Sequence, residues 1–154
     1  MTLRERFGDS LKEAMKARNP KRVSTLRMIV AALKERDIAN RSEKSRVGVG
    51  DDEILSLLVR MIRQREESAT IYESGGRPEL AEAEREEIAI IREFLPQQMS
   101  DEEMHAAVRS VAAELGAATM KDMGRVMGAL KERYAGRLDL AKTGASVKEL
   151  LAAG

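Results

Sequence analysis

Apolar residues recur at intervals of three and four along most of the chain, which is the spacing of one face of an α-helix. The pattern begins with Leu3, Phe7 and Leu11 and returns near the end of the chain in Val147 and Leu151. No segment shows the sustained apolar–polar alternation of a half-buried strand. The pattern therefore predicts an all-α protein.

Capping residues and helix breakers divide this pattern into seven predicted helices. Their starts are marked by Thr2, Pro20, Asp51, Pro78, Ser100, Met123 and Ser146. Three of the starts carry a capping box, in which a hydroxyl and a carboxylate satisfy free backbone N–H groups. These boxes pair Thr2 with Glu5, Ser100 with Glu103, and Ser146 with Glu149. Glycines are expected to end the third, fifth and sixth helices, at Gly75-Gly76, Gly116 and Gly136.

Pro96 predicts both the end of the fourth helix and a domain boundary, because proline disfavours a continuing helix. We expect an N-terminal four-helix domain over residues 1–96 and a smaller three-helix C-terminal domain over residues 97–154, with 97–99 as a hinge. Residues 41–50 are polar, basic and glycine-containing, and they predict a mobile loop.

Composition excludes several kinds of chemistry. The 154 residues contain no cysteine and a single histidine, His105, so neither thiol catalysis nor a histidine-rich metal site is possible. His105 is offset by one position from the apolar stripe of its helix, which indicates a surface side chain. No apolar run reaches the length of a membrane span, and the first residues do not resemble a signal peptide. We expect a cytoplasmic protein with no cofactor, no metal and no catalytic site of its own.

Four glutamates within residues 82–87 could suggest a carboxylate metal site. Only side chains three or four residues apart share a helix face, as Glu84 and Glu87 do. No second acidic helix is expected opposite them. We interpret the cluster as a solvated face with ion pairs to Arg77 and Arg85.

Charge is strongly segregated although the net charge is only +1. Residues 1–46 contain 13 basic and 6 acidic side chains, whereas residues 51–98 contain 6 basic and 12 acidic ones. The two regions can attract each other, within one molecule or between two, or the basic regions can bind an anionic partner. The charge pattern alone leaves both explanations open.

Basic side chains also surround the predicted sixth helix, and nucleic-acid backbones are bound mainly through such residues. The candidate contacts are Lys121, Arg125, Lys131, Arg133, Arg137 and Lys142. The same helix contains Gly124 and Gly128, four residues apart on one face. Each weakens a helix by up to about 1 kcal/mol, so we expect a close approach there, either by a neighbouring helix or by the backbone of a ligand.

Methionines crowd the C-terminal region, and Met side chains can fill a core or form an adaptable binding surface. They are Met99, Met104, Met120, Met123 and Met127. A core role is the simpler interpretation. The alternative function is a protein-interaction module that docks through this Met-rich bundle.

Several short motifs, taken in order, resemble the YqeY family along nearly the whole chain. They include Lys12-Glu-Ala-Met-Lys16, Phe94-Leu-Pro96, Met123-Gly-Arg-Val-Met-Gly128 and Gly136-Arg137. Arg125 stands where family members often carry lysine, which preserves the charge. The turn Gly136-Arg-Leu-Asp139 departs from the more usual Gly-Arg-Ala-Asp.

This family is similar to the tail domain of the B subunit of tRNA-dependent aspartyl/glutamyl amidotransferase. The resemblance implies an all-helical fold in two parts and a module that holds the body of a tRNA. It also implies amidotransferase or other translation proteins as partners. A label of carbon–nitrogen ligase with glutamine as amido donor follows from the resemblance only, since no residue pattern supplies a mechanism for it.

Overall fold

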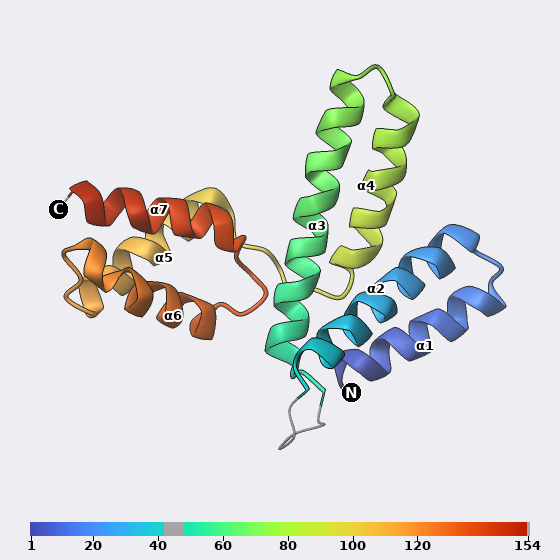
Figure 1. Cartoon of the computed structure of the whole chain (residues 1–154), viewed down its shortest axis with the longest axis horizontal. Helices are drawn as coiled ribbons and strands as arrows, with labels where there is room; N and C mark the ends of the chain where they lie inside the picture. Colours follow the sequence, from blue (N-terminus) through green and yellow to red (C-terminus); the bar gives the residue numbers. More distant parts are fainter. Residues whose placement is uncertain (42–47, 154) are drawn as a thin grey trace. The chain divides into compact units, whose positions relative to one another are not determined.

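The structure is a computed structural model that describes residues 1–41 and 48–153. The described residues form seven α-helices and one short 3-10 helix and contain no strand, so the all-α prediction is confirmed (Figure 1). Most of the loop predicted over residues 41–50 lies outside the described residues. The chain forms two compact units, Met1–Leu95 and Pro96–Gly154, each with its own apolar core.

The first unit consists of two helical hairpins (Figure 1). Its helices are α1 (Leu3–Lys16), α2 (Pro20–Ala39), α3 (Asp51–Ser74) and α4 (Pro78–Arg92). The predicted capping box of α1 is present, with Thr2 accepting the Glu5 N–H and Glu5 accepting the Thr2 N–H. Asn19 caps α2 by accepting the Arg22 N–H. Local capping therefore sets where these helices begin.

The core of the first unit joins both hairpins. Leu26 and Ile29 of α2 and Leu58 of α3 are completely buried. Phe7 of α1 meets Phe94 edge to face, with ring centroids 4.9 Å apart. Burying each such apolar side chain stabilises the fold by roughly 1.5–3 kcal/mol, so this core is the main force that holds the two hairpins together.

The end of α4 differs from the prediction, because the helix ends at Arg92 rather than at Pro96. Residues after Arg92 continue in a tighter turn, in which Phe94 donates its N–H to the Ile91 carbonyl at 3.1 Å. This turn lies where the Phe94 ring packs against Phe7. Pro96 has no N–H, and its ring would collide with the carbonyl of Arg92 in a continuing helix, so the α-helix ends one turn before the proline.

Ion pairs connect the basic N-terminal region with the acidic region that follows it. Lys21 pairs with Glu87 at 3.3 Å, and Arg22 pairs with Glu93. A weaker contact of 3.7 Å joins Arg36 to Glu53. Part of the charge segregation is thus used for attraction inside the first unit.

Glu87 corrects the interpretation of the acidic cluster. Its side chain is only 17% exposed, and its two oxygens bind Arg65 at 2.9 Å and Lys21 at 3.3 Å. Arg85 instead pairs with Glu73 of α3. Glu87 was expected on a solvated face, and this expectation was wrong. Its ion pairs connect α4 with Lys21 of α2 and Arg65 of α3. A helix face that is polar in sequence can thus pack against polar partners.

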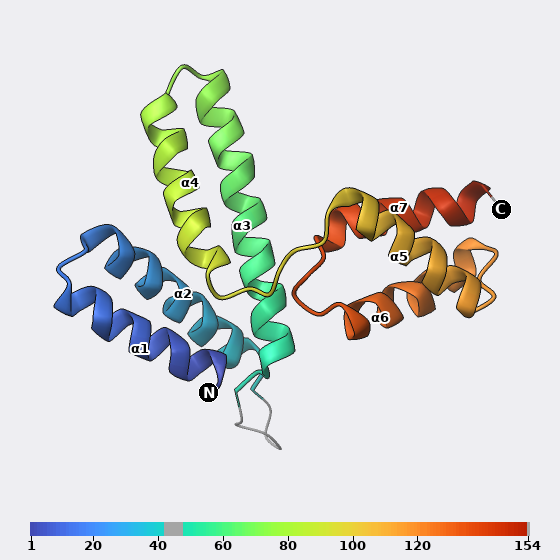
Figure 2. The same ribbon diagram turned by 180° about the vertical axis from the view of Figure 1, so that it is seen from behind.

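The second unit contains α5 (Asp101–Glu114), the 3-10 helix η1 (Met120–Asp122), α6 (Met123–Arg133) and α7 (Leu140–Ala153) (Figure 2). Its core is formed chiefly by Val108, Val111, Val126, Leu130 and Val147. The capping box of Ser100 and Glu103 is present as predicted. Each of the three helices contributes to the core.

The start of the last helix was predicted wrongly. The Asp139 carboxylate accepts the N–H groups of Ala141 and Lys142, so α7 begins at Leu140 rather than after Ser146. The Ser146 hydroxyl is instead 2.8 Å from Nδ1 of His105 on α5. His105 is exposed, as expected, and this contact joins α5 to α7.

Residues 97–99, expected to form a hinge, are hydrogen-bonded to the turn before α7. Met99 donates its N–H to the Arg137 carbonyl at 3.0 Å, and Arg137 Nε donates to the Gln97 carbonyl at 2.9 Å. The Gln98 amide donates to the Gly136 carbonyl. These bonds attach the segment to the rest of the second unit.

Candidate nucleic-acid interface

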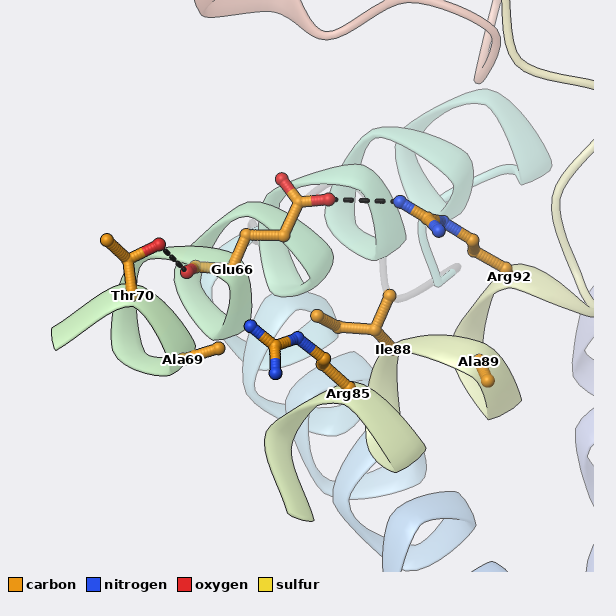
Figure 3. A pocket seen from close by; sticks show the side chains of 7 residues that line it. All are labelled: Glu66, Ala69, Thr70, Arg85, Ile88, Ala89 and Arg92. Atoms are coloured by element: carbon orange, nitrogen blue, oxygen red, sulfur yellow. Dashed lines mark hydrogen bonds and ion pairs between the residues drawn. The ribbon is translucent and has the colours of Figure 1, made fainter. Parts of the chain in front are cut away.

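A cavity of about 360 Å³ lies between α3 and α4 (Figure 3). Ala69, Ile88 and Ala89 supply its apolar lining, and charged side chains lie around it. Arg92 pairs with Glu66 at 3.0 Å, and Arg85 pairs with Glu73. Because its charged groups already have partners, the cavity has little capacity to bind a charged ligand.

The residues that the structure describes contain no cluster of three or more His, Cys, Asp or Glu side chains that could hold a metal ion. Among these residues, no helix is long and apolar enough to cross a membrane. The search for a functional site therefore turns to the surface of the second unit, where the candidate residues lie.

The two glycines of α6 lie on its exposed side. A Cβ atom built on Gly124 or on Gly128 would meet no atom within 4 Å apart from the helix's own backbone. Packing onto α5 or α7, which was one of the two explanations for these glycines, is therefore excluded. The backbone of α6 is open to solvent at both positions, and a second molecule can approach it closely.

Three of the six predicted basic residues lie within four residues of these glycines along the chain, Lys121 in η1 and the other two in α6. Lys121 lies one turn before Gly124, Arg125 follows it directly, and Lys131 lies three residues after Gly128. All three cations are exposed. We call Lys121, Gly124, Arg125, Gly128 and Lys131 the α6 face. Glu132 adds one negative charge at its C-terminal end.

Arg125 is held in place by its neighbours. Its Nη2 donates to Asp122 Oδ1 at 2.9 Å and to the Leu115 carbonyl at 3.3 Å. The side chain nevertheless remains 56% exposed, so an ion can reach it. Asp122 and Arg125 are three residues apart in the sequence, a spacing that allows an ion pair on a helix. Asp122 was not identified from the sequence as the residue that orients Arg125.

Asp122 also closes the turn before α6. Its carboxylate accepts the Ala118 N–H at 3.0 Å and the Thr119 N–H at 3.3 Å. The pKa of Asp122 is lowered below its ordinary value by three hydrogen bonds to the carboxylate. The largest effect comes from the Ala118 N–H, and smaller ones come from the Arg125 guanidinium and the Thr119 N–H. Asp122 is therefore ionised at neutral pH and keeps Arg125 in position.

The other three predicted basic residues do not join the α6 face. Arg133 points to α5 and pairs with Glu114 at 2.7 Å. Lys142 of α7 lies 3.8 Å from Asp101. Arg137 is half-buried and donates to the Gln97 carbonyl, as described above. Helix phase separates Arg133 from the glycines, and sequence proximity alone could not show this.

Side chains suited to stacking on bases are scarce on the described surface. Phe7 and Phe94 are 1% and 3% exposed, and both tyrosines, Tyr72 and Tyr134, are half-buried. Single-stranded nucleic acid is usually bound through exposed aromatic rings. The described surface therefore offers few rings on which unpaired bases could stack.

The methionines of the second unit are mostly part of its interior. Met104 is buried, and Met99, Met123 and Met127 pack against the core as partly buried side chains. Met120 is 43% exposed. This placement agrees with core filling and leaves little methionine surface for a docking partner.

The fold and the α6 face define a class of protein: a small all-helical module with an exposed, glycine-containing cationic helix. The sequence matches the family model of the Yqey-like protein over residues 4–151, so the chain belongs to the YqeY-like family. Comparison of the sequence with curated proteins finds no match.

Proposed function

We propose that the chain is an RNA-binding accessory module that holds the sugar–phosphate backbone of structured RNA on its α6 face. The observation that carries this proposal is the exposure of Gly124 and Gly128 in the interior of a helix. Glycine costs roughly 0.5–1 kcal/mol relative to alanine at such a position, and no neighbouring atom requires its small size. A ligand that approaches the helix backbone gives these glycines a role.

The charges on the α6 face support a ligand rich in phosphate groups. Lys121, Arg125 and Lys131 place three exposed cations around an open stretch of backbone. Lys and Arg side chains bind phosphate groups and release the counterions that surround a nucleic acid. Double-stranded RNA is recognised largely by its shape and backbone, which requires no aromatic side chains. Structured RNA therefore fits this face better than a single strand.

Transfer RNA is the proposed ligand because of the family resemblance to the tail domain of the amidotransferase B subunit. In that role the chain holds the body of the tRNA, while amidotransferase or other translation proteins carry out the chemistry in the cytoplasm. The label of a glutamine-dependent carbon–nitrogen ligase is a property of such a complex in this proposal, and the chain itself contributes RNA binding.

The test is fluorescence anisotropy of the purified protein with labelled deacylated tRNA over a series of salt concentrations. We expect saturable binding with a log K that falls linearly with log salt concentration. Unlabelled tRNA should displace the probe, and single-stranded oligouridine of equal length should do so poorly. If no binding is found even at low salt, the proposed function is wrong.

A further inference from the structure

The α1–α2 hairpin carries a second group of exposed cations, and two of them lie on α2. Arg27 and Lys34 share one face of this helix, with Ala31 between them, and all three side chains are exposed. At a rise of about 1.5 Å per residue, the two cations are roughly 10 Å apart along the helix axis. They form a short basic row on the surface of the first unit.

These two cations differ from the others on α2 in their partners. Three other cations of α2 pair with carboxylates. Lys21 pairs with α4, Arg22 with the turn after α4, and Arg36 with α3. The paired cations stabilise the first unit, whereas Arg27 and Lys34 are exposed and have no carboxylate partner among the described residues.

The register of the hairpin shows which residues of α1 lie level with this row. Arg4 forms two hydrogen bonds with Asp37, of 2.9 and 2.7 Å, which fixes how α1 and α2 lie side by side. On α2, Lys34 lies about one turn before Asp37. On α1, Gly8 lies one turn after Arg4 and Lys12 lies two turns after it, and both residues are exposed.

Gly8 repeats the feature that defines the α6 face. It lies inside a helix, and a Cβ atom added there would meet nothing within 4 Å. As at Gly124 and Gly128, an exposed glycine inside a helix has basic residues within four positions, in this case Arg4, Arg6 and Lys12. We call Gly8, Lys12, Arg27 and Lys34 the α1–α2 face.

We propose that the α1–α2 face is a second contact for the RNA phosphate backbone, additional to the α6 face and located on the other unit. The inference rests on the proposed function and adds a second set of phosphates to it. Charge complementarity selects a polyanion as the occupant. Exposed helix backbone at Gly8 lets a sugar–phosphate strand approach, as it does at α6.

The experiment compares the full-length chain with three double variants in the tRNA anisotropy assay over the same salt series. Arg27→Gln with Lys34→Gln removes the α2 cations, and Arg125→Gln with Lys131→Gln removes two cations of the α6 face. The control, Arg60→Gln with Arg63→Gln, removes the same charge from exposed positions of α3, where Arg63 is paired with Glu67 at 3.3 Å. Circular dichroism and thermal unfolding check that each variant folds.

We expect the α2 variant to weaken binding and to reduce the salt slope by about one for each cation removed. The α3 control should keep the slope of the wild type. If the α2 variant keeps the full slope while the α6 variant loses part of it, the second contact is wrong and the proposed function stands. An equal loss in the α3 control also overturns the second contact, because net charge alone then explains the effect.

Two further outcomes separate the alternatives. Absence of tRNA binding by the wild type contradicts the proposed function and this inference together. Sedimentation of the wild type tests whether a second copy of the chain occupies the α1–α2 face. Salt-sensitive self-association that disappears in the α2 variant, with tRNA binding unchanged, assigns the face to that copy and overturns the RNA contact.

Discussion

Arg125 donates a hydrogen bond of 2.9 Å to Asp122, three residues earlier, and this contact holds the central cation of the α6 face. The same carboxylate accepts two backbone N–H groups of the preceding turn. One acidic residue thus shapes the start of α6 and orients the residue proposed to meet a phosphate group. Its protonation links the stability of the second unit to pH.

The first prediction concerns this pH dependence. The pKa of Asp122 is lowered from 3.8 in the folded protein, mainly by the Ala118 N–H. A lowered pKa means that the stabilisation is complete above the ordinary value and is lost as pH falls through the folded value. Urea unfolding between neutral pH and strong acid should show a smaller acid-induced loss of stability in Asp122→Asn than in the wild type. Identical pH profiles would contradict this role.

The second prediction separates stability from binding at the glycines. Gly124→Ala and Gly128→Ala should each raise the free energy of unfolding by about 0.5–1 kcal/mol, because helix interiors favour alanine and the added Cβ meets no neighbour. Both should weaken tRNA binding, since the Cβ keeps the RNA backbone away from the helix. Chemical denaturation and anisotropy measure the two effects on the same samples. Stabilised variants that bind tRNA as well as the wild type would show that the close approach does not occur.

The third prediction concerns Gly48, which packs against the Arg4–Asp37 ion pair. A Cβ at this position would lie 2.9 Å from Asp37 Oδ1 and would also collide with the Arg4 guanidinium. Arg4 and Asp37 in addition hold the backbone of Val49 at 2.9 Å. Both colliding groups are the ends of flexible side chains, so we expect Gly48→Ala to lower the free energy of unfolding by about 0.5–1.5 kcal/mol, the range for a weakened hydrogen bond.

Gly8→Ala is the matched control for Gly48, since it makes the same change where nothing lies within 4 Å. It should raise the free energy of unfolding, so the two variants should move in opposite directions. A Gly48→Ala protein as stable as the wild type would mean that the ion pair moves aside without cost.

The fourth prediction tests Glu87 as a connection between helices. Glu87→Gln removes the charge that faces Arg65, whose side chain is only 13% exposed. We expect a loss of about 1–3 kcal/mol in the free energy of unfolding, because a partly buried arginine is left without its carboxylate. Glu67→Gln breaks the exposed Arg63 pair and should cost less than about 0.5 kcal/mol. Equal effects of the two changes would contradict the account of Glu87.

Much of the fold could be predicted from local signals. Thr2, Asn19 and Ser100 cap helices as expected, because a cap depends on a few neighbouring residues. The start of α7 was missed because Ser146 and Glu149 also match a capping pattern. Asp139 provides the actual cap, and Thr143 and Gly144 in the first turns are weak helix formers, which hid this part of the helix.

The site was predictable as a set of residue types and less so as an arrangement. Gly124, Gly128 and Arg125 were identified from composition and spacing, and all three are exposed in the structure. Arg133 and Arg137 belonged to the same list, but their partners, Glu114 and the Gln97 carbonyl, are distant in sequence. Such contacts depend on how helices pack, which a pattern along one chain does not reveal.

The most direct test of the α6 face compares two double variants with the same change in charge. Arg125→Gln with Lys131→Gln removes cations of the face, whereas Arg133→Gln with Lys142→Gln removes cations that point to Glu114 and Asp101. We predict that the first pair weakens tRNA binding and reduces the salt slope by about two, while the second pair changes the slope by less than one. Equal losses in the two variants, or no loss in the first, would contradict the assignment of RNA binding to the α6 face.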